Sequence, residues 1–159
     1  MNTIYFLLGS NMGNSNELLS IAIKNIEKKI GKVYRKSSLY QTAAWGNINQ
    51  PDFINQVIIV KSKLDAGICM ERALTIENEL GRVRTQKNAP RIIDIDILYF
   101  NKDIINLSNL TVPHPAIQLR RFALVPLNEL SPNFVHPVLK KTNHQLLKNC
   151  PDHLNVKKI

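Results

Sequence analysis

Cysteine is scarce in this sequence, which has only Cys69 and Cys150 among its 159 residues. The two do not form a Cys-x-x-Cys pair, and no histidine cluster accompanies them, so neither a zinc site nor a disulfide framework is indicated. We therefore interpret both as reduced thiols.

Long hydrophobic runs are also lacking near the N-terminus. The apolar stretch Ile4 to Leu8 is too short for a signal peptide or a membrane span, and no basic segment precedes it. The chain has no linker or internal repeat, and its hydrophobic content of 44% is typical of a globular protein. We expect one domain over residues 1–159, a cytoplasmic location, no membrane association and a monomeric state.

Acidic residues are too few to balance the basic ones. Twelve Asp and Glu face 21 Lys and Arg, which gives a formal net charge of +9. Such an excess favours anionic partners, and nucleic acids, membrane surfaces and phosphorylated small molecules all qualify. The phosphate-binding motif Gly-x-x-x-x-Gly-Lys-Ser/Thr is absent, so we interpret Gly9-Ser-Asn-Met-Gly13 as a simple turn.

Two aspartates stand within an otherwise apolar run, Ile92-Ile-Asp-Ile-Asp-Ile-Leu-Tyr-Phe100, which predicts a strand buried on both faces. Alternate side chains of a strand point to the same face, so Asp94 and Asp96 share one side, about 6.6 Å apart by strand rise. Burying two like charges together requires a compensating cation or a bound proton. A divalent metal ion such as Mg²⁺ would supply the cation, and a structural ion pair with arginines is the alternative.

The remaining pattern predicts an α+β fold. Strands are expected over residues 3–9, 33–42, 53–63 and 92–100, with helices over 14–30 and 65–80. The order βαββαβ indicates a ferredoxin-like core, an antiparallel or mixed sheet with helices packed against it. Beyond it we expect one short strand, irregular backbone where prolines recur between residues 113 and 137, and a last short helix capped by Thr142.

Basic residues gather in the sequence near the aspartates. They are Arg82, Arg84, Lys87 and Arg91 in the loop before the strand, and Arg120 and Arg121 in a later segment. Arginine offers a planar fork that matches phosphate oxygens, and Mg²⁺ held by carboxylates can bridge phosphates. For any one of these residues a solvated surface charge is the alternative, but the cluster as a whole predicts a polyphosphate site.

Four further side chains are candidates, each with a structural alternative. Glu77 lies on the apolar stripe of its predicted helix and points inward, either to pair with an arginine or to hydrogen-bond a ligand. His114, between two prolines, could donate to a phosphate or shape its loop. Phe53 and Phe122 could sandwich a flat heterocycle or pack in the core.

Taken together, the motifs resemble one family, the 6-hydroxymethyl-7,8-dihydropterin pyrophosphokinases. The likeness covers nearly the whole chain. Its marks are Gly9-Ser-Asn11, Gln50-Pro-Asp-Phe-Ile-Asn55, Gly81-Arg-Val-Arg84, Pro90-Arg-Ile-Ile-Asp-Ile-Asp-Ile-Leu98, Leu110-Thr-Val-Pro-His-Pro115 and Arg120-Arg-Phe-Ala-Leu-Val-Pro-Leu127.

The resemblance implies an enzyme of folate biosynthesis. Such enzymes move the pyrophosphoryl group of ATP to the hydroxymethyl oxygen of the pterin and release AMP, with two Mg²⁺ ions, on a ferredoxin-like fold with flexible catalytic loops. No protein nucleophile is needed, so catalysis would rest on alignment and electrostatics. The partners would be these small molecules, with no nucleic acid and no membrane.

The resemblance also assigns roles residue by residue. It implies catalytic roles for Arg82, Arg91, Asp94 and Asp96, of which the two aspartates bind the metal ions. It implies pterin binding by Thr42, Ala43, Trp45, Phe53, Asn55, Asp94 and Phe122. It implies ATP binding by Glu77, Arg82, Arg84, Lys87, Arg91, Ile97, Thr111, His114 and Arg120.

The sequence departs from the family pattern at two places. Family members often have Arg-Trp-Gly-Pro-Arg before the strand, where this chain has Lys87-Asn-Ala-Pro-Arg91, so a loop tryptophan is missing. Asn109 stands where a basic residue also occurs in the family. Neither change removes a metal ligand, but the first should alter loop closure, because aromatic burial worth about 1 to 3 kcal/mol is lost.

Two other functions use the same features. A basic RNA-binding module on the same topology would use Tyr5-Phe6 and Tyr99-Phe100 on the strands, although two aspartates on a central strand would repel phosphate. A metal-dependent phosphatase would use the carboxylates but should release phosphate without a pterin acceptor.

Overall fold

The computed structural model describes residues 1–44, 49–82 and 91–159. The elements, in chain order, are β1 (Asn2–Ser10), α1 (Ser15–Lys29), β2 (Lys32–Lys36), β3 (Tyr40–Thr42), β4 (Phe53–Ser62), α2 (Ala66–Glu79), β5 (Asp94–Phe100), β6 (Ile105–Leu107), β7 (Leu110–Val112), the 3-10 helix η1 (Ile117–Leu119), α3 (Arg121–Leu130), α4 (Asn143–Lys148) and β8 (Val156–Lys158). No helix among the described residues has the length and apolar character needed to span a membrane.

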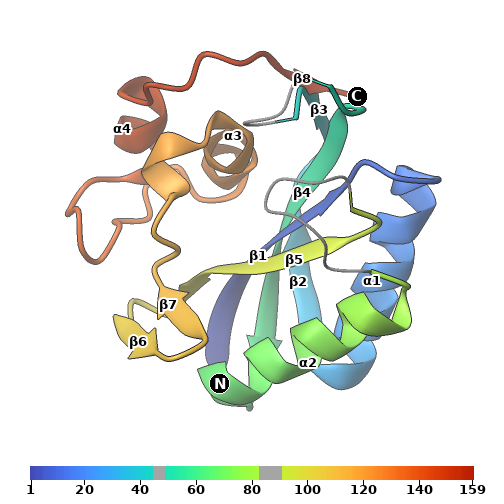
Figure 1. Ribbon diagram of the computed structural model, residues 1–159. Helices are drawn as coiled ribbons and strands as arrows, with labels where there is room; N and C mark the ends of the chain where they lie inside the picture. Colours follow the sequence, from blue (N-terminus) through green and yellow to red (C-terminus); the bar gives the residue numbers. More distant parts are fainter. Residues whose placement is uncertain (45–48, 83–90) are drawn as a thin grey trace.

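One large sheet organises the molecule. Its strand order is β5-β1-β4-β3-β8, with β2 also pairing with β4, and every pair in it is antiparallel. Helices α1 and α2 cover one face, while α3 and α4 cover the other (Figure 1). The predicted α+β class is thereby confirmed, and the sheet is antiparallel rather than mixed.

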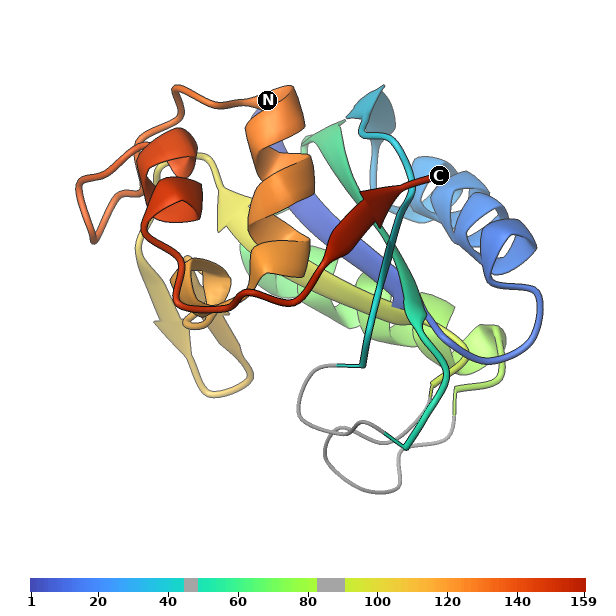
Figure 2. The same ribbon diagram turned by 90° about the horizontal axis from the view of Figure 1, so that it is seen from above.

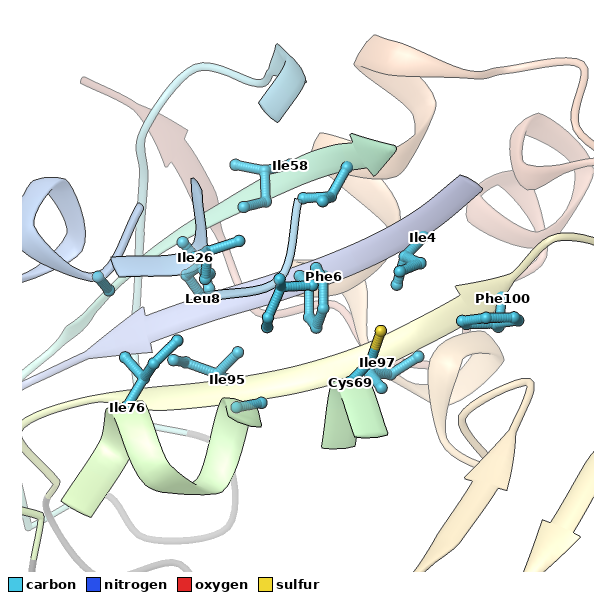
Figure 3. Close-up of a cluster of buried hydrophobic side chains, with 14 of the residues drawn as sticks. Ile4, Phe6, Leu8, Ile26, Ile58, Cys69, Ile76, Ile95, Ile97 and Phe100 are labelled. Atoms are coloured by element: carbon cyan, nitrogen blue, oxygen red, sulfur yellow. The ribbon is translucent and has the colours of Figure 1, made fainter. Parts of the chain in front are cut away.

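The core on the α1–α2 side follows from the alternation predicted for the central strands. Ile4, Phe6 and Leu8 of β1 meet the isoleucines of β5 and the inner sides of both helices (Figure 3). The helices begin at the predicted caps, because Asn14 accepts from the N–H of Glu17 and Asp65 accepts from the N–H of Ile68. The caps and the apolar stripes therefore fix both helices from local sequence.

The second core lies between the other sheet face and α3 and α4. A register shift between Tyr5 and Phe6 pairs Tyr5 with Tyr99 but Phe6 with Ile97, so that Leu98 and Tyr99 both belong to this core. An extra residue in one strand of this kind is a β-bulge. Asp94, Asp96 and Leu98 share one face of β5 by strand alternation, and the bulge adds Tyr99 to that face, which α3 covers.

The predicted strand over residues 33–42 is interrupted. It forms β2 and β3, separated at Ser37, whose Oγ accepts from the N–H of Val57 at 3.0 Å while its carbonyl accepts from Gln56 Nε2 at 2.8 Å. A serine side chain that bonds to a neighbouring backbone can replace a regular ladder contact. The hydrophobic pattern across residues 33–42 gave no sign of this local substitution.

The prediction of irregular backbone around the later prolines is wrong for residues 121–130, which form α3 with Pro126 inside it. A proline within a helix costs about 3 kcal/mol. Here Ala123, Leu124 and Leu127 are fully buried against the sheet, and this apolar stripe offsets the cost. The short strand β8 also went unpredicted, because its three residues have no pattern of their own and pair with the edge of β3.

Candidate functional site

A pocket opens on the sheet face that carries α3, at the end of β1 where the strand leaves the core. Its floor follows the strand register: Asp94 of β5 pairs with Gly9 of β1, and Gly9 pairs with Asn55 of β4. Asp96 pairs with Leu7 in the same way. The residues that line the pocket are Leu7, Gly9, Thr42, Ala43, Phe53, Asn55, Arg91, Asp94, Asp96, Arg120 and Phe122. The predicted shared face of the two aspartates is confirmed.

Asp94 sits at the centre of an ion-pair chain. Arg82 Nη1 lies 2.8 Å from its Oδ1, and Arg91 Nη1 lies 3.0 Å from its Oδ2. Arg82 Nη1 also lies 2.9 Å from Oε2 of Glu77, which is 1% exposed and accepts the backbone N–H of Ile95 at 2.7 Å. Glu77 therefore points inward as predicted and holds Arg82 against Asp94, the first residue of β5.

Asp96 has no such partner. Among the described residues none forms a hydrogen bond or an ion pair with its carboxylate. Burial, together with the negative charges of Asp94 and Glu77, raises the pKa of Asp96 to about 8, although Arg120 and Arg82 act in the opposite direction. A carboxylate held in this way is stabilised by any cation that enters the pocket.

The two aspartates suit a hard cation such as Mg²⁺. Their carboxylates line the same pocket, and burial together with nearby negative charge raises the pKa of Asp96, so a bound cation would stabilise its ionised form. No group of three or more His, Cys, Asp or Glu that could hold a metal is found in the described ranges. Mg²⁺ needs no such group, since it often binds through one or two carboxylates and completes its shell with water and phosphate oxygens. The donor set fits a metal ion that is shared with a phosphorylated substrate.

Two phenylalanines stand on different elements beside this acidic floor. Phe53 begins β4 and Phe122 lies in the first turn of α3, and both line the pocket. The guanidinium of Arg91 lies 5.3 Å from the ring centre of Phe53, and that of Arg120 lies 5.7 Å from the ring centre of Phe122. Both distances are within the range of cation–π contact, so arginine and aromatic side chains form each wall together.

Polar atoms without protein partners point to a ligand with hydrogen-bonding edges. Asn55 Nδ2 and Thr42 Oγ1 are buried, and neither has a hydrogen-bond partner among the described residues. Buried polar groups in folded proteins are nearly always satisfied. Both residues line the pocket, so a bound molecule with polar edge atoms would satisfy them.

Three of the residues assigned to ATP, His114, Thr111 and Ile97, are not among the residues that line the pocket. His114 follows β7, and its Nδ1 accepts from the N–H of Ala116 at 3.1 Å, which leaves the proton on Nε2. Burial lowers the pKa of His114 to about 4, with a further contribution from Arg120, so the imidazole is neutral at pH 7. Thr111 is exposed on β7, whereas the side chain of Ile97 packs in the α1–α2 core on the face opposite the aspartates.

Three of the predicted site residues, Trp45, Arg84 and Lys87, lie outside the described residues. The pocket is thus described for its floor, its aromatic walls and the ion-pair chain around Asp94.

Sequence reasoning did not assign Gly9 or Asn11 to the site. Gly9 was assigned to the end of the first strand and to the turn after it, and it lies within β1, where a Cβ would come 2.7 Å from Asn55 Oδ1. Glycine inside a strand is itself a signal of close approach. Asn11, 4% exposed, accepts from the N–H of Arg91 at 2.9 Å and donates to Gln50 Oε1 at 2.6 Å and to the carbonyl of Pro51 at 3.0 Å. It ties three segments together, which no local pattern indicates.

The chain is similar to known proteins of one family. Residues 5–132 match the profile of the family described as 7,8-dihydro-6-hydroxymethylpterin-pyrophosphokinase. The chain is 37% identical over 141 residues to 2-amino-4-hydroxy-6-hydroxymethyldihydropteridine pyrophosphokinase of Aquifex aeolicus, covering 89% of this chain and 88% of that protein. It is 34% identical to the protein of the same name from Haemophilus influenzae, covering 99% and 98%.

Longer proteins also contain this domain. The folic acid synthesis protein FOL1 of Dictyostelium discoideum is 35% identical over 158 residues, which are 99% of this chain but 24% of that protein. The crystal structure of wild-type Plasmodium falciparum HPPK-DHPS with STZ-DHP has a TM-score of 0.76 at 19% identity, covering 92% of this chain and 43% of that one. The last comparison supports the fold. The family match and the bacterial relatives establish that this chain belongs to the 7,8-dihydro-6-hydroxymethylpterin-pyrophosphokinase family.

Proposed function

We propose that this chain transfers the pyrophosphoryl group of ATP to the hydroxymethyl oxygen of 6-hydroxymethyl-7,8-dihydropterin. The oxygen attacks the β-phosphorus, the bond from that phosphorus to the oxygen bridging it to the α-phosphorus breaks, and AMP leaves with the bridging oxygen. The hydroxyl proton is released to solvent. The observation that carries the proposal is that a carboxylate pair and an aromatic, hydrogen-bonding wall line one pocket.

The aromatic end of the pocket would hold the pterin. Phe53 and Phe122 offer two ring faces, and stacking between them suits a flat heterocycle. Asn55 Nδ2 and Thr42 Oγ1, which have no hydrogen-bond partner in the part of the chain that the structure describes, would bond the polar edge of the ring. This would place the hydroxymethyl group toward Asp94, in line with the phosphates. We assign Ala43 and Trp45 to pterin binding as well.

The acidic end would receive the triphosphate. Two Mg²⁺ ions held by Asp94 and Asp96 would neutralise the phosphate oxygens, and supply Lewis-acid polarisation when bound. Arg82 and Arg91, already positioned on Asp94, would contribute fixed positive charge to the transferring group, as would Arg120 from the opposite wall. We assign Arg84 and Lys87 to the same phosphate chain.

The nucleotide side would use groups on the segment after β7. His114, neutral with its proton on Nε2, would donate a hydrogen bond to a phosphate, and Thr111 would contact ATP nearby. Glu77 would act through Arg82 rather than by touching the nucleotide, because it is buried behind that arginine. For Ile97 only a main-chain role in ATP binding is proposed, since its side chain faces the core.

The RNA-binding alternative loses its structural basis. Tyr5, Phe6, Tyr99 and Phe100 are each at most 6% exposed and pack in the two cores. RNA-recognition sheets need aromatic rings on an open face for base stacking. These four rings offer none.

The proposed function is tested by incubating the protein with ATP, Mg²⁺ and 6-hydroxymethyl-7,8-dihydropterin, and by separating AMP from ADP. We expect AMP and the pterin diphosphate only when all three components are present. Omission of Mg²⁺ tests the metal requirement separately from the pterin requirement. ADP or free phosphate formed without pterin would contradict the proposal and favour a phosphatase.

A further inference from the structure

Helix α3 carries one wall of the pocket at its first turn and an acidic residue at its last. Phe122 lies at the pocket end, whereas Glu129 lies at the other end, beside the joint between β2 and β3. The Glu129 carboxylate accepts from Tyr40 Oη at 2.6 Å, from Ser38 Oγ at 3.2 Å and from the N–H of Ser38 at 3.1 Å. One side chain therefore fastens α3 to β3.

Strand β3 leads from this contact directly to the other wall of the pocket. Tyr40 pairs with Asn55 and Thr42 pairs with Phe53 in the β3–β4 register. Directly opposed residues of an antiparallel pair have Cβ atoms about 4.5–5.5 Å apart on the same face, and residues two apart on one strand also share a face. Tyr40 thus lies on the same sheet face as Thr42, Phe53 and Asn55. Those three residues line the pocket.

We propose that Tyr40 and Glu129 are positioning residues that set the separation between the two pterin-binding walls. Their hydrogen bond joins the strand pair that carries Phe53 and Asn55 to the helix that carries Phe122. The inference rests on the proposed function, because it assigns a purpose to the width of that pocket. Neither residue lines the pocket, so both act through the elements they hold.

Apolar packing holds α3 on the sheet, and two further hydrogen bonds act at its ends rather than on β3. Asp152 Oδ2 accepts from the N–H of Arg121 at 3.1 Å, and Arg35 Nη1 donates to the carbonyl of Leu130 at 2.9 Å. Both bonds fix the ends of the helix backbone. The hydrogen bond between Tyr40 and Glu129, in contrast, reaches β3, and β8 pairs with the outer side of that strand, beside α3 (Figure 2).

The shifted pKa values of Tyr40 and Glu129 keep the hydroxyl protonated and the carboxylate ionised, as their hydrogen bond requires. Burial, with the hydrogen bond to Glu129, raises the pKa of Tyr40 to about 12, so its hydroxyl stays a donor. For Glu129 partial desolvation raises the pKa, but the hydrogen bonds from Tyr40 and Ser38 outweigh that effect and lower the pKa, so the carboxylate stays an acceptor. Glu129 itself is exposed and fills no core space, so its removal should leave the packing under α3 intact.

The test compares Tyr40→Phe, Glu129→Ala and the double variant with wild type. We expect the KM for the pterin to rise roughly three- to tenfold in Tyr40→Phe, because its bond to Glu129 is lost, and at least as much in Glu129→Ala, which also removes the acceptor of the Ser38 bonds. Both changes break the Tyr40–Glu129 bond, so the double variant should be no worse than Glu129→Ala. Glu129→Gln, which keeps an acceptor oxygen, should recover part of the loss, and the KM for ATP should stay within about twofold of wild type.

Two matched controls make the same kinds of substitution at residues away from the pocket. Tyr34→Phe removes the hydroxyl of a tyrosine that is 63% exposed on β2, and Glu71→Gln neutralises an exposed glutamate on α2. Both should leave the pterin KM unchanged. A lowered melting temperature without a change in pterin KM in the Tyr40 and Glu129 variants would make the pair merely structural and overturn the inference. Absence of AMP from the wild-type protein would instead reject the proposed function.

Discussion

Asp94 and Asp96 share a strand face but differ in their surroundings. Asp94 is held by Arg82 and Arg91, whereas Asp96 has no hydrogen-bond or ion-pair partner among the described residues and stands near other carboxylates. The same substitution should therefore have different structural consequences at the two positions, although both residues are proposed to bind metal. Replacing Asp94 removes an ion pair from Arg82 and one from Arg91, while replacing Asp96 removes a buried carboxyl group that no ion pair among the described residues offsets.

Asp96→Asn is expected to abolish turnover, by at least about a thousandfold, because one proposed metal ligand is lost. Its melting temperature in metal-free buffer should equal or exceed that of wild type. Asp94→Asn should also abolish turnover, but should lower the melting temperature, since Arg82 and Arg91 lose an ionised partner. AMP assays and thermal unfolding in EDTA check both effects. Full activity of either variant at ordinary Mg²⁺ would overturn the metal assignment.

Gly9→Ala tests the floor of the pocket. The added Cβ would lie 2.7 Å from Asn55 Oδ1, so the buried amide must turn away from its position. We expect the pterin KM to rise at least about tenfold, because a misplaced hydrogen-bonding group costs about 1–3 kcal/mol. Gly67→Ala is the matched control, since its Cβ would approach other atoms no closer than 3.5 Å and it lies on α2. An unchanged pterin KM for Gly9→Ala would place Asn55 outside the pterin site.

At the scale of elements, the side chain of Asn11 joins the end of β1 to the segments that precede β4 and β5. Asn11, in the segment after β1, is hydrogen-bonded to Gln50 and Pro51, which precede Phe53, and to the backbone of Arg91. The substitution Asn11→Ala should lower kcat/KM more than tenfold through misplacement of Arg91 and Phe53, and should destabilise the fold by about 1–3 kcal/mol. Steady-state kinetics and urea unfolding measure the two quantities. Lost stability with normal kinetics would restrict Asn11 to a structural role.

Prediction from sequence succeeded for elements whose signal is local. The helices α1 and α2 follow from an N-cap and a stripe, and β1, β4 and β5 follow from apolar runs. It failed where a distant partner decides. The break between β2 and β3 depends on Ser37 bonding β4, and α3 forms around Pro126 because the sheet buries its leucines. These contacts involve residues far apart in sequence, which short-range patterns do not contain.

At the scale of the whole molecule, stability should depend on pH through His114. Burial lowers its pKa to about 4, whereas the unfolded chain titrates near 6.5, so the unfolded state binds more protons between these values. Stability is therefore fully present above about pH 6.5 and falls by up to about 3 kcal/mol as the pH drops to 4. The pKa of His136 is also lowered by burial and adds to the same trend.

Urea unfolding at pH 7 and pH 5 measures this dependence. His114→Gln keeps a hydrogen-bonding side chain without a titrating group, so its free energy of unfolding should fall less between the two pH values than that of wild type. An equal fall in both proteins would show that the His114 pKa is not depressed in the folded state.

The sequence by itself determined the chemistry of this protein. The aspartates on one strand face, the basic residues around them and the apolar periodicity are properties of neighbouring positions, because strand and helix repeats place such residues together without distant help. Only the tertiary structure decided which of these groups meet: Arg82 contacts both Glu77 and Asp94, Asn55 lies against Gly9, and Phe122 and Phe53 line one pocket. Strand register and the docking of α3 set those distances, and both depend on packing between segments that the chain brings together only when it folds.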